Sequence, residues 1–478
     1  MLINHLSKLA EADLDRKAVI TESQALTYKQ LWKTVRFKSD ELFAQGLSKG
    51  LTVGISIKDE FQHFVVSLAL LKIGCNQITL PTFESEEYNK SLSLKAGVTF
   101  IISDIVGTDA LKIFCFISSN QSITNINNHI TAPKLEGHIF FVTSGTTGSP
   151  KIIPLSEDNL FIQGKHWQYP ESVDIFWRPT PIEYNNSKRQ RLYNISCAST
   201  NVFIDASKTD LINTIINYKI TRLNLSVVQA RSLAENLIQT NRTLPENCHV
   251  RIGGSAVGPK LRSNLLENLT KNLHITYATS EFGSIATACP DNHCDMLNAG
   301  YIHPDAKLEI VDNSDIPVMS GCTGHIRIKS SSMANYYYND PIATEKSFRD
   351  GWFYPGDMGR IETNGLLYIS GRADDMLSLA SINIFPSEIE TAFCKHPDII
   401  ECAAFGIKSK LFGDIPILAV TLSNLIDMPH LEKYGRDVLG IRAPRKIFPI
   451  DRIPRNRGGK ISKKELVSLF NEWKLKND

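Results

Sequence analysis

Short strand-like runs alternate with helix-like segments over about the first 370 residues, and this alternation restricts the chain to few architectures. Helical periodicity marks residues 31–43 and 63–71, whereas residues 53–57, 100–103 and 138–142 are apolar runs of strand length. Such alternation is typical of α/β layers built on largely parallel sheets. We therefore expect an α/β fold with a large N-terminal domain of layered sheets and helices.

From about residue 300 the pattern changes to short strands separated by turns, which we expect at 307–311, 325–329, 360–362 and 366–370. This pattern predicts a small β lobe within the large domain. The charged, turn-prone stretch 371–375 then marks a boundary. The sequence predicts an N-terminal domain over residues 1–373 and a small α+β C-terminal domain over residues 374–478. The asparagine-rich stretch 118–131 is expected to be a surface loop.

Composition excludes several classes of protein. Hydrophobic residues make up 42% of the chain and charged residues 21%, as in a globular protein with a large core. The net charge of +2 gives no argument for binding nucleic acid. The nine cysteines are scattered and odd in number, which favours free thiols in a reducing compartment. Because no secretory signal and no run of 18 apolar residues is present, we expect a cytoplasmic protein without a membrane span.

A loop rich in hydroxyls and glycine follows the apolar run 138–142. Its polar and glycine residues are Thr143, Ser144, Gly145, Thr146, Thr147, Gly148, Ser149 and Lys151. Backbone N–H groups in such a turn can form an anion-binding nest, which hydroxyls and a lysine would complete. The spacing is not that of the nucleoside triphosphatase P-loop. Taken alone, the stretch is either a phosphate cradle or a plain polar loop with a solvated lysine.

Four further segments follow this loop in a fixed order. They are Gly-Gly-Ser-Ala at 253–256, Tyr-Ala-Thr-Ser-Glu-Phe-Gly at 277–283, Gly-Trp-Phe-Tyr-Pro-Gly-Asp at 351–357 with Gly-Arg-Ala-Asp at 371–374, and Ile-Pro-Arg-Asn-Arg-Gly-Gly-Lys-Ile-Ser at 453–462. Together the five segments resemble the adenylate-forming (AMP-binding) superfamily of acyl-CoA synthetases, luciferases and peptide-synthetase adenylation domains. The resemblance extends from about residue 26 to residue 460.

The resemblance implies an ATP site. The loop 143–151 would hold the β- and γ-phosphates, and the turn that contains Gly254 and Ser255 would accept adenine. Tyr277 would stack on adenine, and Ser280 would donate a hydrogen bond to the α-phosphate. Glu281 would ligate Mg²⁺, which prefers hard oxygen ligands.

The resemblance also implies which residues contact the ribose, where the hinge lies and which lysine acts in the reaction. Asp357 would accept hydrogen bonds from the ribose hydroxyls, and Arg372 would contact the ribose and phosphate side. Asp374 would be the hinge about which a mobile C-terminal domain rotates. Lys460 would bridge the substrate carboxylate and the α-phosphate, where its charge offsets the negative charge that accumulates during the reaction.

The implied reaction has two steps and needs no side-chain nucleophile. A small-molecule carboxylic acid attacks the α-phosphorus of Mg·ATP to give an acyl-adenylate and pyrophosphate, and a thiol then displaces AMP. Coenzyme A is the leading acceptor. The alternative is a stand-alone adenylating enzyme that loads the phosphopantetheine of a carrier protein. A non-catalytic nucleotide-binding relative is a further alternative, although the five segments retain their charged residues.

The chain departs from the family's pattern at two places. Glu183, Tyr184 and Asn185 replace the aromatic–histidine pair of many acyl- and aryl-CoA ligases, and Ala380 and Ser381 replace glycines that would line the thiol tunnel. The residues expected to form the substrate pocket are Tyr184, Asn185, Val228, Gly253 and Ala278. Their mixed polarity does not distinguish a fatty acid from an aryl or amino acid.

Overall fold

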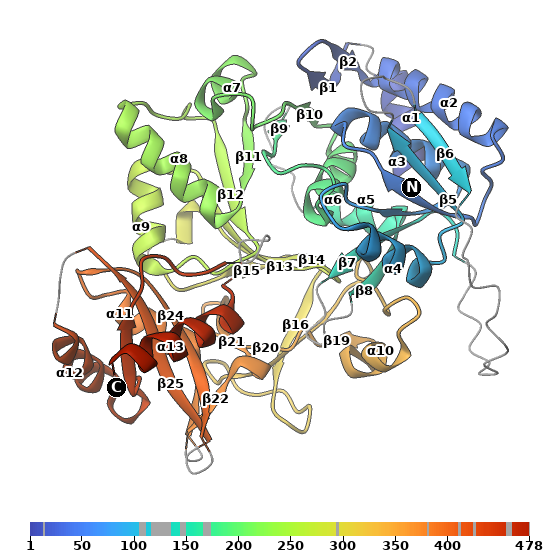
Figure 1. Cartoon of the computed structure of the whole chain (residues 1–478). Helices are drawn as coiled ribbons and strands as arrows, with labels where there is room; N and C mark the ends of the chain where they lie inside the picture. Colours follow the sequence, from blue (N-terminus) through green and yellow to red (C-terminus); the bar gives the residue numbers. More distant parts are fainter. Residues whose placement is uncertain are drawn as a thin grey trace. The chain divides into compact units, whose positions relative to one another are not determined.

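The computed structural model describes residues 1–12, 15–104, 111–115, 135–143, 150–165, 174–292, 296–379, 382–409, 413–423, 427–455 and 461–477. The chain forms two compact units (Figure 1). The first consists of residues 1–224, 278–284 and 329–351, and the second of residues 225–277, 285–328 and 352–478. The predicted surface loop 118–131 lies outside the described residues.

The first unit contains a six-stranded sheet whose four inner strands are parallel. In sheet order the strands are β6 (Leu111–Cys115), β5 (Phe100–Asp104), β3 (Thr52–Ser56), β4 (Asn76–Thr79), β7 (His138–Thr143) and β8 (Lys151–Ser156), and the two edge strands run antiparallel. The predicted strands 53–57, 100–103 and 138–142 are therefore confirmed, as is the parallel arrangement. Helix α3 (Glu60–Ile73) confirms the predicted helix 63–71, and its residues 63–71 are all buried.

A second group of strands in the first unit has the order β2-β1-β10-β9-β11, in which β1, β10, β9 and β11 are parallel. Helix α2 confirms the predicted helix 31–43, and a capping box at Thr27 fixes where it begins. The bounds of these elements are β1 (Lys17–Thr21), β2 (Ala25–Thr27), β9 (Ile175–Trp177), β10 (Thr200–Phe203), β11 (Arg222–Leu225), β18 (Phe348–Arg349), α1 (Leu2–Ala12), α2 (Tyr28–Ala44), α4 (Glu86–Ala96), α5 (Glu157–Lys165), α6 (Asn185–Tyr193), α7 (Leu211–Asn217) and α10 (Pro341–Ser347).

The second unit contains the predicted β lobe. The strand order is β12-β13-β14-β15-β21-β20-β17-β19, with β16 beside β17, and the strands of the lobe pair antiparallel. The predicted strand 307–311 is observed unchanged as β16, whereas the strand predicted at 360–362 begins three residues earlier at Asp357. The bounds are β12 (His249–Gly253), β13 (Leu273–Thr279), β14 (Gly283–Ala288), β15 (Gly300–Ile302), β16 (Lys307–Val311), β17 (Gly324–Lys329), β19 (Trp352–Phe353), β20 (Asp357–Ile361), β21 (Leu366–Arg372), α8 (Val227–Thr240) and α9 (Pro259–Asn268).

Residues beyond 376 form a separate sheet, ordered β23-β22-β25-β24 with β26 beside β25. Side chains alternate between its two faces, so Cys402 and Ala404 pack toward α11 and α12, while Ala403 and Phe405 pack toward α13. This is the predicted α+β arrangement. The bounds are β22 (Leu377–Leu379), β23 (Ile382–Ile384), β24 (Ile399–Ser409), β25 (Gly413–Leu422), β26 (Lys446–Pro449), α11 (Pro386–Phe393), α12 (Met428–Leu439) and α13 (Lys463–Asn477).

The predicted domain boundary between residues 373 and 374 lies inside the second unit and stays a prediction. In the part of the chain that the structure describes, every helix is too short or too polar to cross a bilayer.

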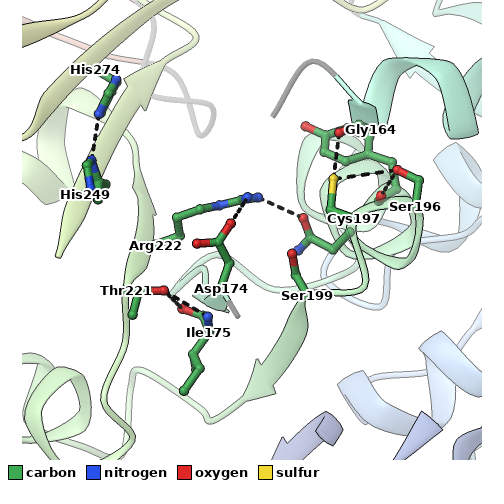
Figure 2. A network of polar contacts seen from close by, with 12 residues as sticks. Gly164, Asp174, Ile175, Ser196, Cys197, Ser199, Thr221, Arg222, His249 and His274 are labelled. Carbon is green, nitrogen blue, oxygen red and sulfur yellow. Dashed lines mark hydrogen bonds and ion pairs between the residues drawn. The ribbon is translucent and has the colours of Figure 1, made fainter. Parts of the chain in front are cut away.

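A buried ion pair joins two parallel strands of the first unit. Arg222 at the start of β11 donates to Asp174, just before β9, over 2.7 Å, and the two side chains are only 3% and 9% exposed (Figure 2). Arg222 also donates to the amide oxygen of Asn194 at 3.2 Å. Because a buried charge that loses its partner is costly, this pair constrains how β9 and β11 meet.

We expect Asp174→Asn to lower the free energy of unfolding by about 3 kcal/mol, because it removes the carboxylate that pairs with the buried Arg222 charge. Urea denaturation followed by circular dichroism measures the change. The matched control is Glu136→Gln, which breaks an exposed ion pair between Lys49 and Glu136 and should cost less than about 1 kcal/mol. Equal effects of the two substitutions would contradict this assignment.

Candidate active site

The flanks of the predicted phosphate loop lie on adjacent strands of the first unit. Thr143 ends β7, Lys151 begins β8, and the two residues are paired opposite each other in the antiparallel ladder. The strand predicted before the loop is confirmed, and the structure adds that the loop connects two antiparallel strands. Ser144, Gly145, Thr146, Thr147 and Gly148 lie outside the described residues.

Tyr337 connects Lys151 to Glu281. Its hydroxyl donates to Glu281 Oε1 at 2.7 Å, and its ring lies 4.6 Å from Lys151 Nζ. The Tyr337 side chain is 4% exposed. Backbone hydrogen bonds hold the segment on both sides, from Ala334 N to Glu281 O and from Tyr338 N to Ile152 O, each 2.8 Å. The structure thus brings together the ends of three segments that are far apart in the sequence.

Sequence analysis assigned no role to Tyr337. The available signal was its place in the aromatic run 336–338, but a tyrosine there is equally compatible with the hydrophobic core.

Glu281 is 8% exposed, whereas Ser280 is partly exposed and Ala278 is exposed. Within the described ranges, no three or more histidine, cysteine or acidic side chains cluster in a way that could hold a metal ion.

Two of the residues predicted for the acyl pocket, Tyr184 and Asn185, lie at the N-terminal end of α6, near β7. Asn185 Nδ2 donates to the carbonyl oxygen of Val142, and the Tyr184 ring stacks on Phe83 with centroids 4.9 Å apart. Glu183 is buried and accepts hydrogen bonds from the backbone N–H and the hydroxyl of Thr82. Burial raises the pKa of Glu183, and the Thr82 hydrogen bonds partly oppose this effect.

In the second unit, Tyr277, Asp357 and Arg372 form one polar cluster. The Tyr277 hydroxyl donates to Asp357 Oδ2, and Arg372 Nη1 lies 3.5 Å from Asp357 Oδ1. Asp357 and Arg372 face each other across β20 and β21. Arg372 also donates to Asp374 from Nε at 2.9 Å and from Nη2 at 3.2 Å. These hydrogen bonds lower the pKa of the exposed Asp374.

The turn predicted to accept adenine directly follows β12. Gly254 has a φ of 92°, a left-handed conformation that favours glycine, and a Cβ there would meet no atom within 4 Å. Gly253 pairs with Thr276 on the parallel strand β13, which places Gly253, Gly254 and Ser255 beside Tyr277. Val228 lies in the first turn of α8 and is 48% exposed. Lys460 lies outside the described residues.

Two family models match most of the chain. The AMP-binding enzyme family matches residues 6–338, and the AMP-binding enzyme C-terminal domain matches residues 388–460. The 2-succinylbenzoate–CoA ligase of Bacillus subtilis (strain 168) is 25% identical over 481 residues, which cover 97% of each chain.

Two solved structures share the fold. The amide bond synthetase McbA from Marinactinospora thermotolerans has a TM-score of 0.84 at 20% identity, covering 98% of this chain and 100% of that one. The o-succinylbenzoate CoA synthetase of Bacillus subtilis, solved with its acyl-adenylate intermediate, has a TM-score of 0.80 at 22% identity, covering 97% of each chain. The same synthetase has been solved with ATP and a magnesium ion. Because the family match extends over more than half of its length, the chain belongs to the AMP-binding enzyme family.

Proposed function

We propose that this enzyme activates a small carboxylic acid with ATP, releases pyrophosphate, and transfers the acyl group from the adenylate to the thiol of coenzyme A. The observation that carries the proposal is the contact of Tyr337 with both Lys151 and Glu281. It places a cation and a carboxylate beside the hairpin loop whose composition suits phosphates. ATP–pyrophosphate exchange across a panel of carboxylic acids tests the first step.

The residues present are suitable for binding Mg·ATP. Glu281 is a buried carboxylate whose Oε1 accepts from Tyr337, and Mg²⁺ in nucleotide sites takes one or two carboxylates together with phosphate oxygens. When bound, the ion would neutralise phosphate charge. Lys151 and the hydroxyls of the loop 143–149 would hold the leaving pyrophosphate, and Ser280 would position the α-phosphate.

The cluster of Tyr277, Asp357 and Arg372 would hold the nucleoside. Asp357 is already fixed by a hydroxyl and a guanidinium, so its carboxylate is oriented before the ribose arrives. Tyr277 borders the small-residue turn 253–255, which suits a flat base.

We assign to Lys460 the bridging of the substrate carboxylate and the α-phosphate, where its charge would offset the negative charge that accumulates. The domain division at residues 373 and 374 and the hinge at Asp374 are part of the same proposal. Asp374 is exposed and bound by Arg372, and a rotation about it would have to break or carry along this pair.

The acceptor is tested separately from adenylation. The relatives named above join their acids to coenzyme A or, in one case, form amide bonds. Coenzyme A, a holo-carrier protein and a simple amine are therefore supplied in parallel to the acid and ATP that support exchange. Formation of the acyl-CoA thioester alone supports the proposal, and acyl transfer only to the carrier protein supports the alternative of a stand-alone adenylating enzyme.

We also place the enzyme in the cytoplasm. Free thiols suit a reducing compartment, and they are found at Cys75, Cys197, Cys248, Cys289, Cys322, Cys394 and Cys402. ATP binding without exchange for any acid would instead indicate a non-catalytic nucleotide-binding relative.

Lys460→Ala is expected to reduce pyrophosphate exchange at least about 100-fold, because the charge that stabilises the reacting anions is removed. The fold should be unchanged by circular dichroism. Lys464→Ala, an exposed lysine on α13, is the matched control and should retain exchange. Wild-type exchange in Lys460→Ala would refute the role of this lysine.

Glu281→Gln is expected to raise the Mg²⁺ concentration needed for half-maximal exchange on the order of tenfold, since the carboxylate charge is lost. Tyr337→Phe keeps the ring beside Lys151 but loses the hydrogen bond to Glu281, so its effect should be in the same direction and smaller. Titration of Mg²⁺ at saturating ATP measures both variants. Tyr336→Phe serves as the control, and an unchanged Mg²⁺ dependence in Glu281→Gln would exclude Glu281 as a ligand.

A further inference from the structure

Helix α6 is made mostly of polar and charged residues, yet it is buried. Ser187, Lys188, Arg189, Gln190 and Arg191 are between 0% and 6% exposed. Buried charges are normally paired, because an unpaired one has a large desolvation cost. We therefore consider which partner compensates the charge of each cationic residue of α6.

Two of these cations have partners. Arg191 forms an ion pair with Glu60 and donates to the carbonyl oxygens of Thr180 and Arg178. Lys188 donates to the hydroxyl of Thr79 at 3.1 Å, and burial lowers the pKa of Lys188 to about 7, so this side chain can lose its charge near neutrality.

Arg189 is different. Its Nε and Nη2 atoms are buried and find no hydrogen-bond acceptor among the described residues. The guanidinium lies against the Phe141 ring, 5.1 Å from its centroid. Burial lowers the pKa of Arg189 to about 10, which leaves the group charged at neutral pH. It is thus a buried cation whose free N–H groups suit an anion from outside the protein.

The position of Arg189 indicates which molecule could supply that anion. Asn185, one helical turn earlier, donates to Val142 O, so the same face of α6 lies along the end of β7. The negative charge of Glu281 acts on the Arg189 guanidinium, which places Arg189 within electrostatic range of the predicted Mg²⁺ ligand. Arg189 also contacts Phe141, two residues before the end of β7, and lies on the same face of α6 as Asn185, a residue predicted for the acyl pocket.

We propose that Arg189 determines specificity by pairing with a second carboxylate on the acid, so that the enzyme selects acids carrying an anionic group remote from the reacting carboxyl. This inference rests on the proposed function. A guanidinium matches a carboxylate with two parallel hydrogen bonds, and the aromatic ring beneath it limits competition from water. An acid without the second carboxylate would leave the donors of Arg189 unsatisfied.

Matched acids test the proposal. Exchange is measured with heptanedioic and heptanoic acid, and with benzene-1,4-dicarboxylic and 4-methylbenzoic acid, in the wild type, Arg189→Met and Arg189→Lys. We expect the wild type to prefer the diacid of at least one pair by about 100-fold in kcat/KM. Arg189→Met should abolish or reverse this preference, and the change should appear in the KM for the acid. Arg189→Lys should restore part of the preference. The KM for ATP should not change.

Thermal denaturation provides a readout that does not depend on activity. The preferred diacid should raise the melting temperature of the wild type but not that of Arg189→Met. The free variant should be at least as stable as the wild type, because an uncompensated buried charge has been removed.

The outcomes separate the two proposals. If no acid supports exchange, the proposed function fails. An increase in melting temperature that the diacid causes in the wild type but not in Arg189→Met would still support the second-carboxylate site. If exchange occurs without preference for either diacid, or if Arg189→Met leaves the preference intact, the role of Arg189 is refuted. An increased KM for ATP in Arg189→Met with unchanged acid selectivity would assign the anion to the nucleotide phosphates and overturn the proposal.

Discussion

The first unit depends on one buried hydrogen bond, from the Tyr337 hydroxyl to Glu281. Residues 329–351 are far in sequence from both β8 and residues 278–284, yet backbone hydrogen bonds at Ala334 and Tyr338 fix them to both. A carboxylate buried to this degree needs a donor, and Tyr337 supplies one while leaving the second carboxylate oxygen for a ligand. Contacts within the first unit therefore fix the position of Glu281.

The second unit contains a similar arrangement around Asp357. Cross-strand pairing with Arg372 and a hydrogen bond from the Tyr277 hydroxyl hold the Asp357 carboxylate. In each unit, therefore, a tyrosine hydroxyl orients a carboxylate side chain. In each case the orientation is achieved by residues from different elements, so it depends on the whole fold being formed.

Much of the fold followed from the sequence because local patterns specify it. The apolar run 138–142 and the periodic apolar positions of α2 and α3 are strong signals, and the strand predicted from that run ends at Thr143, where the polar loop begins. Tyr337 and Arg189 were not assigned roles, since their contacts are long-range. A Lys-Arg-Gln-Arg helix also reads as a solvated surface, whereas tertiary packing buries it completely. The unit boundaries, which cut through β13 and β14, are likewise invisible to composition.

The hydrogen bond from Asn185 to Val142 has a consequence for redesign of this enzyme. One face of a nine-residue helix both lines the predicted acid pocket and is fastened to the strand that enters the phosphate loop. Substitutions that resize the pocket by shifting α6 would therefore also move that loop entrance. Changing side chains on the helix would therefore alter selectivity with less loss of turnover than changing the length or position of the helix.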